Sequence, residues 1–280
     1  MPDKVIEPGE RPKKAYNNYD FLNAPDARPI RVLCELSEPK TRFRKYDIKD
    51  TVVMFGSARI KPKDAAGELL AQIEHTLQKE GASPELELAR ERARRGVHMS
   101  RYYEEAAQLA ERLTTWSKAL PKKKRHFIIC SGGGPGIMEA ANLGANRAGG
   151  LSVSLNISLP MEQVPNPFQT RELAFEFHYF FIRKFWFVYL AKALIVFPGG
   201  FGTFDELFEV LTLVQTKKAK KPMPIVVYGR EYWEEVVNLD ALVRWGTISP
   251  EDLQLFRICD TVDEAYEYLT QELTRLYLGT

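Results

Sequence analysis

The sequence predicts an α/β fold: a Rossmann-like, doubly wound and mainly parallel sheet with helices on both faces. From residue 51 onward, short apolar runs alternate with amphipathic stretches, as they do in repeated βα units. Three of the apolar runs end in small-residue loops, which is typical of the turns that lead from a parallel strand into a helix. With 45% apolar and 27% charged residues, a chain of 280 residues has ordinary globular proportions.

The apolar runs that we expect to be strands lie at 52–55, 127–130, 151–157, 173–177, 193–197, 225–228 and 256–258. The run at 173–177 is rich in aromatic residues and also fits a helix. Helices are expected over a long stretch after residue 58, with breaks near 81–84 and near Gly96, then from 137, at 180–192, from 204, at 232–243 and at 262–276.

Residues 1–50 predict a different organisation. Five prolines precede residue 30, and the hydrophobic periodicity is weak. We therefore expect an N-terminal extension over residues 1–50 and a single domain over residues 51–280. A domain of that length can bury a sizeable core without disulfides.

Charge and cysteine content narrow the class of protein. The 39 basic and 37 acidic residues give a net charge of +2, so there is no global electrostatic case for nucleic acid or anionic lipid. The cysteines Cys34, Cys130 and Cys259 are far apart, which favours a reducing cytoplasm over a disulfide framework. The first 31 residues lack the apolar segment of a signal peptide, and no apolar run is long enough to span a bilayer. We expect a cytoplasmic protein with no membrane partner.

A basic run at 121–126 has the composition of a nuclear-localisation or nucleic-acid patch. It lies between a helix and a strand, at the sheet edge opposite the small-residue loops. We expect a solvated loop there, which makes a nucleic-acid partner a weak alternative. The four histidines show no metal-ligand spacing, and we expect neither a metal nor an organic cofactor.

The small-residue loops are Gly56-Ser57-Ala58, Ser131–Gly136 and Pro198–Thr203. Because parallel strands present their carboxyl ends at one edge, the following helices aim their unpaired amides and positive dipole ends at a common crevice. Such an arrangement of helix N-termini favours the binding of a phosphate group. Any one loop could equally be a tight βα connection. No Gly-Lys-Ser/Thr follows the glycines, and no acidic residue stands where a dinucleotide site needs one. The pattern therefore favours a mononucleotide phosphate.

Arg183 and Glu206 are the charged residues expected to meet at this crevice. The helix that begins near residue 180 is about 18 Å long and the strand that follows is about 17 Å long, so Arg183 returns to the edge where the Pro198 loop lies. Two alternatives stay open: Thr203 and Glu206 also fit a capping box, and Arg183-Lys184 also fits a solvated helix face.

A carboxylate, an arginine and a phosphate cradle suit the cleavage of an N-glycosidic bond. This reaction passes through a ribose with oxocarbenium character, by analogy with O-glycoside hydrolysis. A carboxylate can stabilise that charge or orient the attacking water, and an arginine can hold the phosphate or contact the leaving base.

Three segments carry a resemblance to a known family: Pro198-Gly199-Gly200-Phe201-Gly202-Thr203-Phe204-Asp205-Glu206, Ser131-Gly132-Gly133-Gly134-Pro135-Gly136-Ile137-Met138-Glu139, and Phe55-Gly56-Ser57-Ala58-Arg59. They resemble the PGGxGTxxE, GGGxxGxM and first strand-loop segments of the Lonely Guy (LOG) family. Arg183-Lys184 resembles the family's Arg-Lys pair. The resemblance covers roughly residues 50–275.

The LOG family comprises cytokinin riboside 5′-monophosphate phosphoribohydrolases, long mislabelled as possible lysine decarboxylases. The resemblance implies catalytic roles for Arg183 and Glu206. It implies that the substrate is bound by Lys184, by the phosphate-binding residues Gly199, Gly200, Gly202 and Thr203, and by the pocket residues Gly56, Ser57, Gly133 and Gly134.

The resemblance also implies a homodimer or higher homo-oligomer, with the aromatic helix from Phe180 to Tyr189 as a contact. Where compact members have Met-His-Glu before Arg-Lys, this chain has His178-Tyr179-Phe180-Phe181-Ile182. The insertion at 60–120 and the first 50 residues are similar to a longer bacterial-type subgroup. We therefore expect hydrolysis of AMP and other purine nucleoside monophosphates, with cytokinin nucleotides as a further possibility and a non-catalytic nucleotide carrier as the alternative.

Overall fold

The computed structural model describes residues 11–121, 126–159 and 164–279. Its centre is a seven-stranded, fully parallel sheet with the strand order β4-β3-β2-β1-β5-β6-β7. The strands are β1 Thr51–Phe55, β2 Ile128–Ser131, β3 Ser152–Ile157, β4 Ala174–Phe177, β5 Ala191–Val196, β6 Ile225–Tyr228 and β7 Arg257–Cys259. The order runs outward from β1 in both directions, so the predicted doubly wound fold is confirmed.

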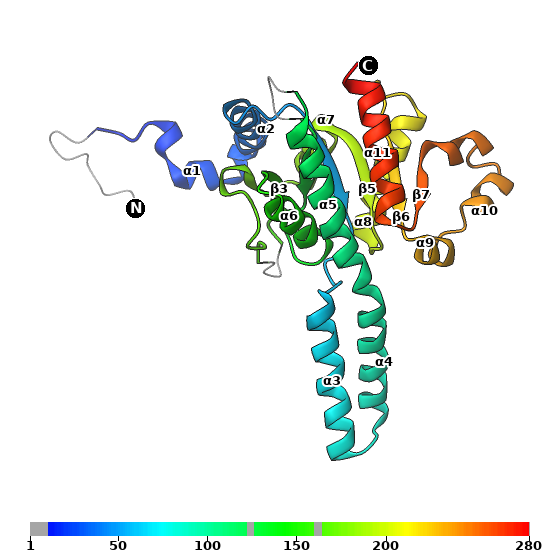
Figure 1. The fold of residues 1–280 in the computed structure, drawn as a ribbon. Coiled ribbons are helices and arrows are strands. Elements are labelled where there is room, and N and C mark those ends of the chain that lie inside the picture. The colour runs from blue at the N-terminus through cyan, green and yellow to red at the C-terminus, as the bar shows by residue number, and fades with distance from the viewer. Residues whose placement is uncertain (1–10, 122–125, 160–163, 280) are drawn as a thin grey trace.

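Helices cover both faces of the sheet (Figure 1). One face packs against α5 Arg101–Ala119, α6 Ile137–Arg147 and α11 Val262–Tyr277. The other packs against α2 Arg28–Lys45, α7 Phe180–Leu190, α8 Phe201–Gln215 and α9 Arg230–Val236. Alternate residues of the buried strands serve opposite faces: Val52 and Met54 belong to the first core and Val53 and Phe55 to the second. Two short helices are α1 Tyr19–Asn23 and α10 Leu239–Arg244. Short 3₁₀ turns lie at Ala15–Asn17, Pro25–Ala27, Arg171–Leu173 and Pro250–Leu255.

Two helices leave this layered body. α3 Lys63–Glu80 and α4 Pro84–Met99 form an antiparallel hairpin that extends away from the sheet (Figure 1), and we call it the α3–α4 arm. The expected break near Gly81 is present, and the one expected near Gly96 lies four residues later, at Ser100. α4 continues through Gly96, and the chain bends only at Ser100 before α5. A single glycine inside a helix destabilises the helix by about 1 kcal/mol relative to alanine, which is not enough to end it.

The N-terminal extension is more ordered than its prolines suggest. Pro29 lies in the first turn of α2, where a proline sacrifices no helical hydrogen bond. α2 then runs for 18 residues and buries Phe43 against Phe175 and Trp186. The weak periodicity has a structural cause: only Pro39 and Phe43 of this helix are fully buried.

Three helix boundaries also differ from expectation. α7 ends at Leu190, so Lys192 belongs to β5, and the helix expected at 232–243 is split into α9 and α10. α8 begins at Phe201 instead of Phe204. Within the described residues, no helix is both long and apolar enough to cross a membrane.

Candidate active site

A cavity of about 990 Å³ lies at the carboxyl edge of the sheet, where the strand order reverses between β1 and β5. This is the switch point at which open α/β sheets hold ligands. Its walls come from the loops after β1 and β5, from the first turns of α7 and α8, and from α9. Gly56, Ser57, Arg183, Gly199, Gly200, Gly202, Thr203 and Glu206 line it, and all eight belong to the site predicted from the sequence.

Backbone hydrogen bonds tie the glycine loops together. The Ser57 amide donates to the Pro198 carbonyl at 2.9 Å, and the Ser57 carbonyl accepts from the Ile137 amide at 3.1 Å. Ser57 thus links the loop after β1 both to the loop after β5 and to the start of α6. Hydrogen bonds between the segments that follow β1, β2 and β5 therefore hold the site together.

The first turn of α8 faces this cavity. The amides of Thr203 and Phe204 donate to the Gly200 carbonyl at 2.9 and 3.1 Å, so Gly200 is the N-cap residue. A Cβ on Gly200 or Gly202 would meet no heavy atom within 4 Å, and neither residue has a positive φ. Protein packing therefore does not require glycine at these two positions, and the open space over their backbone would admit a ligand.

The capping-box interpretation of Glu206 is wrong. Because the helix begins one turn earlier than the sequence suggested, Thr203 lies inside it and cannot act as its N-cap. Glu206 is instead buried in the second turn with 7% of its surface exposed, and its Oε2 has no hydrogen-bond partner among the described residues. Burial raises the pKa of Glu206 to about 7, against the opposing influence of Lys184 and Arg183.

Arg183 reaches the cavity from the first turn of α7. Its Nε donates to the Leu155 carbonyl on β3 at 2.7 Å, and its guanidinium lies 5.1 Å from the Phe187 ring. Burial lowers the pKa of Arg183, and the nearby Glu206 opposes that shift. Arg183 and Glu206, both within the described residues, line the same cavity without forming an ion pair with each other. Each thus keeps polar atoms available for a ligand.

Three of the residues predicted to bind the substrate lie outside the cavity lining. Lys184 turns away from the cavity and pairs with Asp205 at 2.7 Å and with Glu209 at 2.9 Å. Gly133 and Gly134 are not part of the cavity lining. The Gly133 carbonyl accepts hydrogen bonds from Asn166 and Gln169, which fixes the loop after β2 behind the site. The basic residues 122–125 lie outside the described residues.

Two cavity residues could not be found from local sequence patterns. The Tyr232 hydroxyl on α9 donates to the Gly199 carbonyl at 2.6 Å and so orients the glycine loop from 33 positions downstream. Met99, at the base of the α3–α4 arm, lines the same cavity. In both cases the contact depends on the three-dimensional path of the chain.

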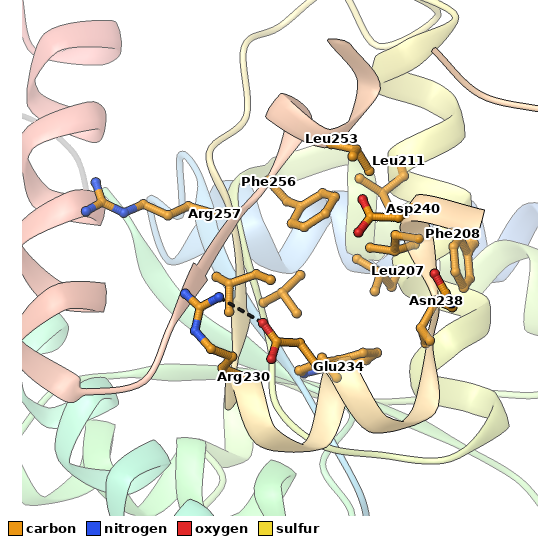
Figure 2. A pocket seen from close by; sticks show the side chains of 15 residues that line it. Leu207, Phe208, Leu211, Arg230, Glu234, Asn238, Asp240, Leu253, Phe256 and Arg257 are labelled. Carbon is orange, nitrogen blue, oxygen red and sulfur yellow. Dashed lines mark hydrogen bonds and ion pairs between the residues drawn. The ribbon is translucent and has the colours of Figure 1, made fainter. Parts of the chain in front are cut away.

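A second cavity, of about 640 Å³, lies on the other side of α9 (Figure 2). Phe256 points into it, and the Arg230–Glu234 ion pair, at 3.0 Å, crosses one side. Arg257 points away, toward the Tyr268 ring at 5.1 Å. None of the predicted site residues lines this cavity. Among the described residues, no group of three or more His, Cys, Asp or Glu side chains could hold a metal ion.

The strand order and the cavity at its switch point define an α/β protein of the Rossmann type with a cavity at the carboxyl edge of the sheet. A family model described as "Possible lysine decarboxylase" matches residues 138–269. The chain belongs to this family, the LOG family.

Curated relatives include a cytokinin riboside 5′-monophosphate phosphoribohydrolase of Arabidopsis thaliana, 28% identical over 151 residues that cover 53% of this chain and 64% of that protein. An uncharacterized protein of Archaeoglobus fulgidus is 33% identical over 120 residues, which are 41% of this chain and 75% of that one. This chain thus spans just under two thirds of the length of the Arabidopsis protein. Among solved structures, the molybdenum cofactor carrier protein of Chlamydomonas reinhardtii aligns with a TM-score of 0.43 and 16% identity, over 81% of this chain and 99% of that one.

Proposed function

We propose that this chain hydrolyses the N-glycosidic bond of purine nucleoside 5′-monophosphates, with release of the free base and ribose 5-phosphate. The observation that carries the proposal is the buried Glu206 carboxyl, which lines the cavity beside Arg183 and leaves Oε2 without a hydrogen-bond partner among the described residues. The activity for which the Arabidopsis relative is named supports the same class of reaction.

The substrate's phosphate would bind at the first turn of α8, where the open space over Gly200 and Gly202 exposes backbone amides and the positive end of the helix dipole. Arg183 adds a positive charge, which offsets the negative charges of the phosphate and of Glu206. Binding the phosphate would hold the ribose in place near Glu206.

In the reaction, the bond between C1′ and the base nitrogen breaks, and the base leaves with the electron pair. Water supplies the hydroxyl group at C1′, and its proton passes to the departing base. The ionised Glu206 carboxylate would stabilise the positive charge that develops on the ribose or orient the attacking water. Apolar side chains around the cavity mouth would accommodate the base: Ile157, Leu159, Phe180, Phe201 and Val236.

The test is release of adenine from AMP, followed by chromatography. Arg183→Ala and Glu206→Ala should each lower turnover by about 10²-fold or more, as the loss of an electrostatic catalytic group does. Glu209→Gln is the matched control, since Glu209 lies one turn further along α8 and outside the cavity lining. Wild-type turnover in both folded alanine variants would refute the proposal.

The same assay separates the alternative function. Tight binding of AMP in calorimetry without any release of base would favour a non-catalytic nucleotide carrier. A panel that contains AMP, other purine monophosphates and cytokinin riboside monophosphates identifies the preferred base.

We also propose that the chain forms a homodimer or higher homo-oligomer through α7. Phe181, Phe185 and Tyr189 are spaced four residues apart, so they share one helix face, and each exposes 43% or more of its surface. Phe185→Asp should lower the sedimentation coefficient to that of a monomer. An unchanged coefficient in the folded variant would rule out this face as the contact.

A further inference from the structure

The helix that carries Arg183 has no capping group of its own. The N-cap residue of α7 is Tyr179, whose side chain caps no amide within the described residues, and the first turn holds no acidic residue. A helix start of this kind leaves backbone amides without acceptors and its positive dipole end uncompensated.

Glu35 of α2, from a distant part of the chain, caps the backbone just before this helix. Its Oε1 accepts from the His178 amide at 2.8 Å, and its Oε2 accepts from the Tyr179 amide at 3.3 Å. Both carboxylate oxygens are thus used on the two residues that precede α7. Hydrogen bonds from amides to a carboxylate are stronger than neutral ones, and negative charge is stabilising at this end of a helix.

A short chain of hydrogen bonds leads from this cap to the candidate active site. Tyr179, whose amide Glu35 holds, accepts from the Arg183 amide through its own carbonyl at 3.1 Å. The Arg183 side chain is then fixed at its far end, where Nε donates to the Leu155 carbonyl at 2.7 Å. The start of α7 therefore sets where the guanidinium enters the cavity.

Glu35 also holds α7 two turns further along. The Trp186 indole Nε1 donates to the Glu35 backbone carbonyl at 2.9 Å, and the Trp186 ring packs on Phe43 with ring centroids 5.4 Å apart. One residue of α2 thus contacts α7 on both sides of Arg183 in sequence, which fixes the helix in position and in rotation about its axis.

We infer that Glu35 is a positioning residue for Arg183, and that the N-terminal extension acts on catalysis through this carboxylate. The inference rests on the proposed function, because it assigns to the extension the task of holding the proposed catalytic arginine. Glu35 itself is not part of the cavity lining and makes no contact with the expected substrate site.

Steady-state kinetics with AMP tests the inference. Glu35→Ala should lower kcat by about 10- to 100-fold, since a small displacement of a catalytic group has effects of that order, while KM changes by less than about threefold. Glu35→Gln keeps one acceptor oxygen and should recover part of the lost kcat. Arg42→Ala is the matched control: Arg42 lies on the same helix but bonds the Glu172 and Ala174 carbonyls, and it should retain kcat at a comparable loss of melting temperature.

A double-mutant cycle separates positioning from general destabilisation. If Glu35 acts through Arg183, Glu35→Ala should cost no further activity in an Arg183→Ala background. A full additional loss there, or an unchanged kcat in Glu35→Ala while Arg183→Ala is impaired, would overturn the inference and leave the proposed function standing.

A readout that needs no turnover keeps the inference testable if the proposed function fails. The Arg183 Nε–H group, held by the Leu155 carbonyl, should give a slowly exchanging signal in ¹H–¹⁵N spectra, assigned by its loss in Arg183→Lys. Glu35→Ala should shift this signal or speed its exchange with solvent, and Arg42→Ala should not. An Arg183 signal that is the same in wild type and Glu35→Ala would refute the link.

Discussion

Gly132 and Arg183 lie so close together that a Cβ on Gly132 would stand 2.5 Å from Arg183 Nη2. The same Cβ would stand 2.6 Å from the Met138 Sδ. The loop after β2 therefore contributes to the site by leaving room for the guanidinium, although Gly133 and Gly134 do not line the cavity.

Gly132→Ala should accordingly displace the Arg183 side chain. We expect turnover of AMP to fall by about 10-fold or more, because Arg183 Nη2 has to shift away from the added methyl group. The measurement is kcat together with a melting curve. Gly96→Ala is the control, because a Cβ at this position has no heavy atom within 4 Å. Replacing a glycine inside a helix by alanine should raise the free energy of unfolding by about 0.5–1 kcal/mol. Full activity in Gly132→Ala would show that the arginine need not stay there.

The pH dependence of activity follows from Glu206. Its pKa, raised to about 7 by burial, places the change from neutral acid to carboxylate within the physiological range. In the proposed reaction the ionised form stabilises positive charge on the ribose, so kcat/KM should rise between pH 5.5 and 8 with a midpoint near 7. Glu206→Gln should be slow and show no such rise. A wild-type profile that is flat over this range would contradict a role for the carboxylate.

The same group makes stability depend on pH. A carboxyl group whose pKa is higher in the folded state than in the unfolded one binds more protons when folded, so the free energy of unfolding falls as pH rises from about 4.5 to about 7. Glu206→Gln removes that contribution. The variant should gain stability relative to wild type on going from pH 5 to pH 8, by about 3 kcal/mol at most. Urea titrations at the two pH values measure this, and a constant difference would contradict it.

Gly200→Ala and Gly202→Ala test the phosphate cradle. Neither change meets a neighbouring atom or a positive φ, so the melting temperature should stay the same or rise slightly. A methyl group over the first amides of α8 should nevertheless raise KM for AMP by about 10-fold, because it keeps the phosphate away from the backbone. Adenosine, which lacks the phosphate, serves as the control ligand and should bind equally well to variant and wild type. An unchanged KM for AMP would place the phosphate elsewhere.

Much of the fold followed from local patterns. The alternation of apolar runs and amphipathic stretches predicted each of the seven strands. The central parallel strands are apolar on both faces because helices cover both sides of the sheet, while the edge strands β4 and β7 are only partly buried. The matched lengths of α7 and β5 predicted that Arg183 returns to the loop before α8. The prediction that Arg183 and Glu206 line one crevice is confirmed, while their chemical roles remain proposals.

What the sequence did not reveal depends on contacts between distant segments. Thr203 and Glu206 satisfy a capping-box pattern, but the Gly200 carbonyl begins the helix one turn earlier, and no local signal distinguishes these two starts. Tyr232 and Glu35 act over 33 and more than 140 positions. Nothing in a single sequence links such pairs.

The α3–α4 arm leaves and re-enters the body next to the cavity, since Arg59 precedes it and Met99 ends it, and both line the cavity. Of the residues in these two helices, all of which are described, only Ala66 and Ala93 are fully buried. A shorter or longer hairpin would therefore leave the packed core of the sheet intact, while the two ends of the hairpin stay beside the cavity.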